Sequence, residues 1–149
     1  MICVAGIDPG KTGGISFISE EGVTAIPLPD PHALRDLLVD WRPRLLFLEK
    51  ATTFPKDGRL GAFRYGHASG VIEGLLIALE IPHRLVVPSE WMREMHKGTS
   101  SANDTKGRSV EAVRRLFPHA DLQCGPRSKK PHLGIVESIL IAEYCRRQK

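Results

Sequence analysis

The stretch GIDPGKTGG, residues 6–14, follows a short apolar run and places four glycines, a proline, a lysine and an aspartate in nine positions. Val4 and Ile7 suit a buried strand, and the glycines and proline end that strand in a tight turn. Asn or Ser would make the turn without a charge, so Asp8 needs another explanation. One class of protein binds a divalent metal with such a carboxylate, and another wraps such glycines around a nucleotide phosphate.

The composition is that of one globular domain covering residues 1–149, with 42% hydrophobic and 26% charged residues. No apolar run reaches the roughly 20 residues of a membrane span, and the three cysteines form no CxxC pair, so we expect a cytoplasmic protein without membrane contact. The net charge of +4 fits an acidic partner such as nucleic acid if a second signal agrees.

Apolar patterning predicts a mixed α/β fold with five strands. The first three strands are expected to form an antiparallel meander, and the later strands alternate with helices, which indicates a mixed sheet covered by helices on both faces. The expected strands cover residues 2–7, 13–19, 23–28, 45–48 and 83–87, and the expected helices cover 31–41, 60–79, a turn from 88, 105–117 and 133–146.

Three acids occur where core residues are expected. Asp8 and Glu49 each end an apolar strand, and Glu137 has only apolar residues and glycine three or four positions away on its helix. An unpaired buried carboxylate costs several kcal/mol unless it is neutralised, paired or bound to a metal. A single such acid is readily explained by a local hydrogen bond, but three of them favour a divalent cation.

Oxygen ligands favour Mg²⁺, with Mn²⁺ as a substitute, over zinc. Two such ions about 4 Å apart can activate water and stabilise the leaving oxygen of a phosphodiester. We therefore expect Asp8, Glu49 and Glu137 to hold two metal ions for phosphodiester hydrolysis. The glycines beside Asp8 are expected to form the tight turn and to leave room for a DNA backbone.

The sequence resembles the RuvC family of Holliday junction resolvases, especially its bacteriophage-type members. The resemblance implies a ribonuclease H-like fold and a Mg²⁺-dependent endonuclease of DNA recombination and repair. It also implies a homodimer that cuts two opposing strands of a four-way junction. The matching pieces run in the family's order and are GIDPG, LFLEK, VPSEW, RRLFPHADL and KKPHLGIVESILIAEYCRR.

Matched position by position, Asp8 and Glu49 correspond to the first two metal-binding acids, and Glu137 to an acid of the last helix. The family generally has a fourth metal-site residue near the start of that helix, Asp or His. Here Leu133 stands at the Asp position, beside His132. We put His132 forward as the fourth catalytic group, either a metal ligand or a proton donor, with a DNA-facing or helix-capping histidine as the alternative.

Basic residues near the acids are candidates for DNA contacts. Lys106 matches a basic position that the family places near the scissile phosphate, with a first-turn surface lysine as the alternative. Arg127, Lys129 and Lys130 precede the helix of Glu137 and are expected at the rim of the metal site, contacting phosphates without reading sequence.

Small residues recur every four positions along the long helix, at Ala62, Gly66, Gly70, Gly74 and Ala78. Interior glycine costs roughly 1 kcal/mol relative to alanine, so Gly66, Gly70 and Gly74 indicate close approach of another helix. That helix is either the last helix of the same chain or the same helix of a second subunit. The opposite face, with Val71, Leu75 and Leu79, is expected to pack on the sheet.

Three alternatives remain open. Asp8, Gly10 and Thr12 also fit the Asp-x-Gly-x-Thr turn of nucleotide-binding modules of the actin and Hsp70 type, although those use two domains to clamp the nucleotide. A broader branched-DNA nuclease for flaps, forks and debranching is not separated from a strict resolvase by sequence. A weakened DNA-binding relative is suggested by the missing fourth acid.

Overall fold

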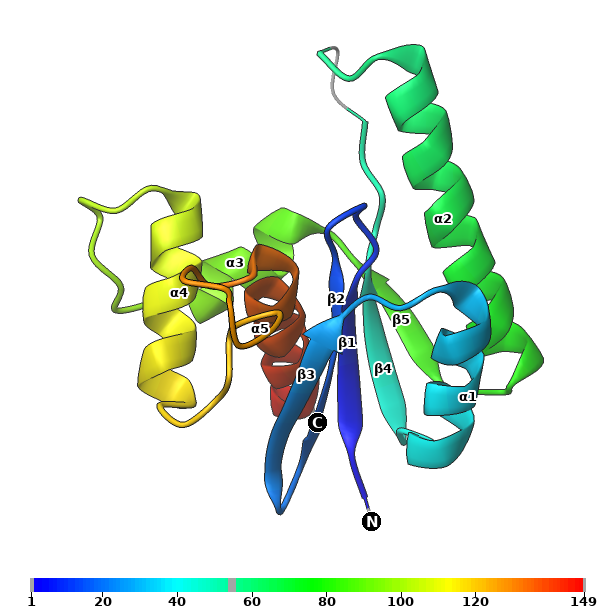
Figure 1. Ribbon diagram of the computed structural model, residues 1–149, viewed down its shortest axis with the longest axis horizontal. Coiled ribbons are helices and arrows are strands. Elements are labelled where there is room, and N and C mark those ends of the chain that lie inside the picture. Colours follow the sequence, from blue (N-terminus) through cyan, green and yellow to red (C-terminus); the bar gives the residue numbers. More distant parts are fainter. Residues whose placement is uncertain (1, 54–55, 149) are drawn as a thin grey trace.

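A five-stranded mixed sheet forms the centre of the computed structural model, which describes residues 2–53 and 56–148 (Figure 1). The strand order is β3-β2-β1-β4-β5. The first three strands are antiparallel neighbours, whereas β4 and β5 run parallel to β1, as the sequence predicts. The strands are β1 (Val4–Asp8), β2 (Gly14–Ser19), β3 (Gly22–Pro27), β4 (Leu45–Glu49) and β5 (His83–Val86).

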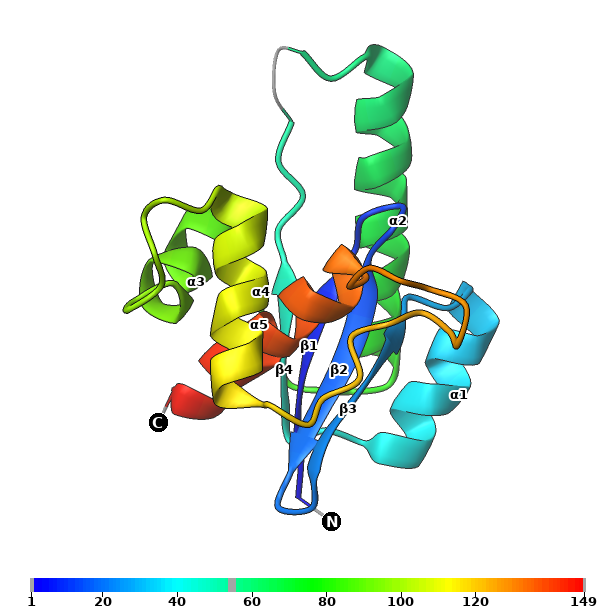
Figure 2. The same cartoon turned by 60° about the vertical axis from the view of Figure 1, so that its left-hand side comes forward.

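Helices cover both faces of the sheet (Figures 1 and 2), which confirms the predicted fold class. On one face lie α1 (Pro31–Trp41) and α2 (Arg59–Ala78). On the other face α5 (Leu133–Arg147) crosses the strands, and α3 (Pro88–Met95) and α4 (Thr105–Leu116) pack against α5. None of the described helices is long and apolar enough to cross a membrane.

The central strands are buried on both faces, which explains their continuous apolar sequence. Alternate residues of β1 enter different cores: Val4 packs with α5, whereas Ala5 and Ile7 pack on the side of α1 and α2. Asp30 caps the N-terminus of α1, as expected from the sequence. Its side chain accepts hydrogen bonds from the amides of His32 and Ala33.

The backbone of α5 lies directly on β1 and β2. A Cβ atom added at Gly6 would overlap the backbone of α5, and one at Gly14 would overlap Gly134. The hydroxyls of Ser16 and Ser138 lie 2.5 Å apart in the same interface. The expectation that these glycines leave room for a DNA backbone is therefore wrong at Gly6 and Gly14, because α5 occupies that space.

The glycine stripe of α2 faces open space. A Cβ added at Gly66, Gly70 or Gly74 meets no atom of the described chain within 4 Å, and α5 lies across the sheet from α2. Packing against the last helix of the same chain is therefore wrong. The sheet-facing side is centred on Ile72 and Leu76, with Leu75 and Leu79 packed beside them as predicted, while Val71 is half-buried.

Candidate functional site

Asp8 and Glu49 lie at the same edge of the sheet. They are the last residues of the neighbouring parallel strands β1 and β4, in which Ile7 pairs with Leu48. Both side chains are almost fully buried, with relative exposures of 8% and 7%. The amide of Gly10 donates a 3.0 Å hydrogen bond to Oδ1 of Asp8, so the turn after β1 fixes this carboxylate.

The third acid, Glu137, belongs to α5, which lies on the face of the sheet opposite α1 and α2. It lies one turn after Gly134, where α5 touches the β1–β2 hairpin, and it is half-buried. Glu137 and Asp8 influence each other's pKa, so their carboxyl groups lie close together. The structure thus brings together the three predicted acids from the first strand, the fourth strand and the last helix.

The three acids perturb one another electrostatically. Burial raises the pKa of Glu49 to about 7, and the charge of Asp8 adds to this effect. Burial, followed by the charges of Asp8 and Glu49, raises the pKa of Glu137 to about 8. Burial also raises the pKa of Asp8, although the Gly10 amide, Glu137 and His132 oppose the shift. Mutual repulsion of this kind is relieved by a bound cation.

The donor chemistry of the three acids fits a hard divalent ion. They supply only carboxylate oxygens, they are mostly buried, and Asp8 raises the pKa of both Glu49 and Glu137. Within residues 2–53 and 56–148, however, no group of three or more His, Cys, Asp or Glu side chains is arranged as a ready metal-binding cluster. Among the described residues, the three acids therefore interact through their charges without forming such a cluster.

Among the predicted basic residues, Lys106 acts on the acids electrostatically. Its charge lowers the pKa of Glu137, against the larger effects of burial and the other acids. Lys106 lies in the first turn of α4 and is exposed. Arg127, Lys129 and Lys130 are exposed on the loop between α4 and α5, and Lys129 lines a hollow with Phe117 and Leu122.

His132 caps α5. Its Nδ1 accepts a 3.2 Å hydrogen bond from the amide of Ile135, which is the capping alternative considered above. Its charge also lowers the pKa of Asp8, so the ring lies within electrostatic range of that acid. Because Nδ1 accepts this bond, the neutral ring carries its proton on Nε2, which can donate to a substrate but can bind a metal only if the Nδ1 cap is released.

Sequence reasoning missed two residues of this site, Trp91 and Tyr65. The buried indole of Trp91 donates a 2.7 Å hydrogen bond to Oε2 of Glu49. Tyr65 of α2 is half-buried, and burial together with the charges of Glu49, Asp8 and Glu137 raises its pKa, so its hydroxyl stays protonated. Its spacing to Ser69 and Ile72 on the buried face of α2 is the signal that could have located Tyr65.

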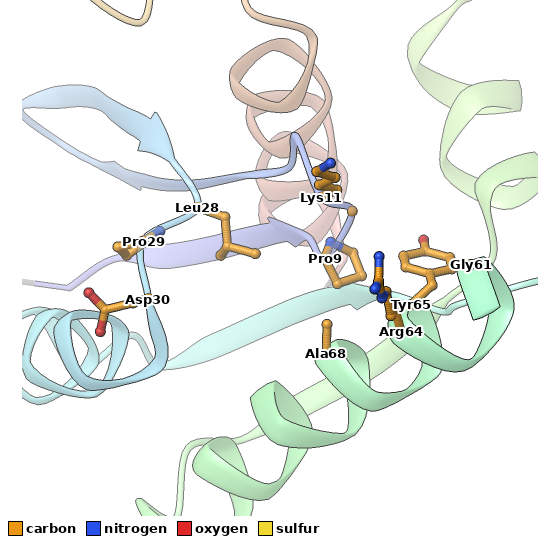
Figure 3. Close-up of a pocket in the computed structure, with 10 residues that line it drawn as sticks. Pro9, Lys11, Leu28, Pro29, Asp30, Gly61, Arg64, Tyr65 and Ala68 are labelled. Atoms are coloured by element: carbon orange, nitrogen blue, oxygen red, sulfur yellow. The ribbon is translucent and has the colours of Figure 1, made fainter.

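Two cavities meet at Tyr65. One, of about 560 Å³, opens at Glu49 and is also lined by Thr52, Ala62 and Pro88. The other, of about 660 Å³, lies between the turn after β1 and α2. Figure 3 shows Pro9, Tyr65, Arg64 and Lys11 at one end of it and Leu28, Pro29 and Asp30 at the other. A cavity therefore opens beside Glu49 on the α2 side of the sheet.

No protein-family model and no curated protein matches the sequence. Solved structures do match. RuvC of Thermus thermophilus in complex with a Holliday junction substrate has a TM-score of 0.66 and 16% identity, covering 95% of this chain and 91% of that chain. A further structure of Thermus thermophilus RuvC has a TM-score of 0.64 and 20% identity, covering 97% and 95%.

The yeast mitochondrial Holliday junction resolvase Ydc2 has a TM-score of 0.51 and 16% identity, covering 93% of this chain and 75% of that chain. At these identities the likeness shows the fold. It confirms that the predicted five-stranded mixed sheet with helices on both faces is the ribonuclease H-like fold of the RuvC resolvases.

Proposed function

We propose that this protein is a divalent-metal-dependent endonuclease that resolves four-way DNA junctions by paired phosphodiester hydrolysis. The observation that carries the proposal is the convergence of Asp8, Glu49 and Glu137 at one edge of a RuvC-type sheet. One of the similar structures, Thermus thermophilus RuvC, holds a Holliday junction substrate. A cluster of largely buried carboxyl groups does not stabilise a protein core, so the presence of three of them at one place supports a catalytic role.

In this mechanism Asp8, Glu49 and Glu137 would hold Mg²⁺, or Mn²⁺ in its place, with two ions per site. Bound divalent ions supply an activated water and stabilise the leaving oxygen. The chain itself fixes the acids: the Gly10 amide holds Asp8, the Trp91 indole holds Glu49, and α5 carries Glu137. His132 would donate a proton through Nε2, or act as a fourth ligand once its Nδ1 cap is released.

DNA binding would extend from the acids to the neighbouring basic residues. Lys106 lowers the pKa of Glu137, which supports the proposal that it would contact the phosphate that is cut. Arg127, Lys129 and Lys130 would contact phosphates farther along the strand. Such contacts give affinity without sequence specificity and weaken with added salt.

We also propose that two copies pair through α2. One face of this helix carries exposed Gly66, Gly70 and Gly74 and the exposed apolar residues Leu60 and Phe63. Two cuts on opposing strands need two sites related by a twofold axis, and glycines permit close helix contact. Sedimentation is expected to show a dimer at micromolar concentration, and a monomer there would contradict this pairing.

The central test is cleavage of a synthetic four-way junction with Mg²⁺ or Mn²⁺, alongside flap, fork and duplex substrates. We expect paired, symmetric cuts in the junction and none in the duplex, with Asp8→Asn inactive but still junction-binding. Equal cutting of flaps and forks would instead establish the broader branched-DNA nuclease. An inert wild type whose junction binding is unaffected by Asp8→Asn would overturn the proposal.

A further inference from the structure

Trp91 makes a direct contact with one of the three acids. Its indole N–H donates to Oε2 of Glu49 at 2.7 Å, its relative exposure is 0%, and that of Glu49 is 7%. An indole N–H only donates, and it carries no charge at any accessible pH. The contact therefore holds the carboxylate oxygen in place without neutralising the carboxylate as a lysine or arginine would.

Local structure explains why Trp91 reaches Glu49. Glu49 pairs with Val86 in the β4–β5 ladder, and α3 begins two residues later at Pro88, which suits the first position of a helix. Long helical side chains point back toward the helix N-terminus. A tryptophan in the first turn of α3 is thus directed at the end of β4.

Trp91 is itself firmly held. It packs in the core with Met95, and its ring meets that of His96 edge-on at 6.1 Å and 84°. Nε2 of the buried His96 lies 2.8 Å from the hydroxyl of Ser109, which belongs to α4. A line of buried contacts therefore runs from Glu49 through Trp91 and His96 to the helix that carries Lys106.

We propose that Trp91 is a positioning residue of the metal site: it fixes Oε2 of Glu49 and so sets the orientation of the carboxylate that would hold the divalent ion. This inference rests on the proposed metal-dependent function. If Glu49 rotates away, the indole N–H is buried without a partner, so the hydrogen bond favours one orientation of the carboxylate over all others. A side chain that is already held in its binding orientation loses less conformational entropy when it binds a metal, so the metal binds more tightly.

The test replaces the indole by benzothienylalanine at position 91, which keeps both fused rings and exchanges the N–H for sulfur. Mn²⁺ affinity is measured by titration calorimetry, and the melting temperature is measured without metal. Loss of an outer partner of a ligand typically costs roughly 10–100-fold in metal affinity, and we expect a loss in this range. Cleavage should fall in kcat, with KM for the junction unchanged, and should recover as Mn²⁺ is raised.

Trp41→Phe is the matched control. Trp41 stacks on Phe17 at 4.6 Å on the opposite face of the sheet. This substitution should lower the melting temperature and leave Mn²⁺ affinity within about twofold of wild type. Trp91→Phe should weaken Mn²⁺ binding as the isostere does, in addition to lowering stability.

These measurements distinguish a failure of the Trp91 proposal from a failure of the proposed nuclease function. A benzothienylalanine protein that binds Mn²⁺ as tightly as wild type overturns the positioning role and leaves the nuclease proposal intact. A wild type that binds no Mn²⁺ and cuts no junction overturns both. Weaker Mn²⁺ binding by the isostere at an unchanged melting temperature supports the positioning role.

Discussion

The carboxyl groups of Asp8 and Glu137 lie close enough to influence each other's pKa, although one belongs to the first strand and the other to α5. The charge of Asp8 also raises the pKa of Glu49, so the three acids form one electrostatically linked group. A divalent cation bound there would offset their negative charge. Metal binding at this point should therefore be coupled to the stability of the fold.

Mn²⁺ or Mg²⁺ is expected to stabilise the folded protein. At a metal concentration 100 times Kd the gain is about 2.7 kcal/mol. For a chain of this size that corresponds to a rise of about 5–10 °C in melting temperature. Asp8→Asn should lose most of this rise, whereas Asp36→Asn, which changes an exposed acid of α1, should keep it. A wild-type melting temperature that does not respond to either ion would contradict the metal site.

Tyr65→Phe is expected to reduce junction cleavage by about 100-fold, at the low end of what a positioned donor contributes. The Tyr65 hydroxyl lies among the charges of Glu49, Asp8 and Glu137 and stays protonated, so it can donate to substrate. Tyr144→Phe is the control, because Tyr144 donates a 2.9 Å hydrogen bond to Glu90 in another part of the molecule. Equal cleavage rates in the two variants would argue against a role for Tyr65.

Lys106→Ala should weaken junction binding and reduce its dependence on salt. One lost phosphate contact lowers the slope of log affinity against log salt by about 1. Fluorescence anisotropy at several salt concentrations measures this slope. Lys97→Ala is the comparison, because Lys97 is an exposed lysine that pairs with Glu94. The same slope in Lys106→Ala and wild type would remove Lys106 from the DNA interface.

Gly134→Ala should destabilise the fold by about 3 kcal/mol, the upper end for overpacked sites. The added Cβ would overlap the backbone of Thr12 and Gly13. Glu137 would be displaced with α5, so cleavage should fall as well. Gly125→Ala, in a loop where a Cβ meets nothing within 4 Å, should change stability by less than about 0.5 kcal/mol. Urea unfolding of both variants provides the comparison.

Glu143 is expected to stabilise the protein at neutral pH and to lose this effect in acid. Burial alone would raise the pKa of Glu143, but hydrogen bonds from Arg146 and Arg147 outweigh it and the pKa is lowered. A lowered folded-state pKa means that the stabilisation is full above the unfolded value of about 4.3 and disappears as the pH falls through the folded value.

Glu143→Gln should therefore cost about 1–2 kcal/mol at pH 7, since charged hydrogen bonds contribute roughly 1.5–3 kcal/mol and both arginines are partly exposed. The difference from wild type should shrink when urea unfolding is repeated below pH 4. A difference that is the same at both pH values would show that packing rather than charge holds Glu143.

The sequence allowed most of the fold to be predicted because strands and caps depend on neighbours in the chain. Asp8 and Glu49 were found because each ends an apolar run, and parallel strands bring such ends together. The contact between Trp91 and Glu49 could not be predicted, because a tryptophan after VPSE is equally suited to a core position. Only the three-dimensional arrangement shows which polar group its N–H meets.

Gly6 and Gly14 likewise have contacts that the sequence alone does not predict. From the sequence, these glycines are expected to form the tight turn and to leave room for a DNA backbone. The structure shows their partner to be α5, which lies more than a hundred residues later. Exposed loops such as the one carrying Lys129 and Lys130 have no apolar pattern that fixes their position, so their relation to the acids stays a prediction.

The position of α5 has a consequence for synthesis of the protein. Asp8 and Glu49 leave the ribosome early, whereas Glu137 belongs to α5, which is made after all five strands of the sheet. Until that helix settles on Gly6 and Gly14, the growing chain holds only two of the three acids and leaves one face of its sheet uncovered. A chain still being translated, or one interrupted before α5, therefore lacks one of the three acids proposed to hold the metal.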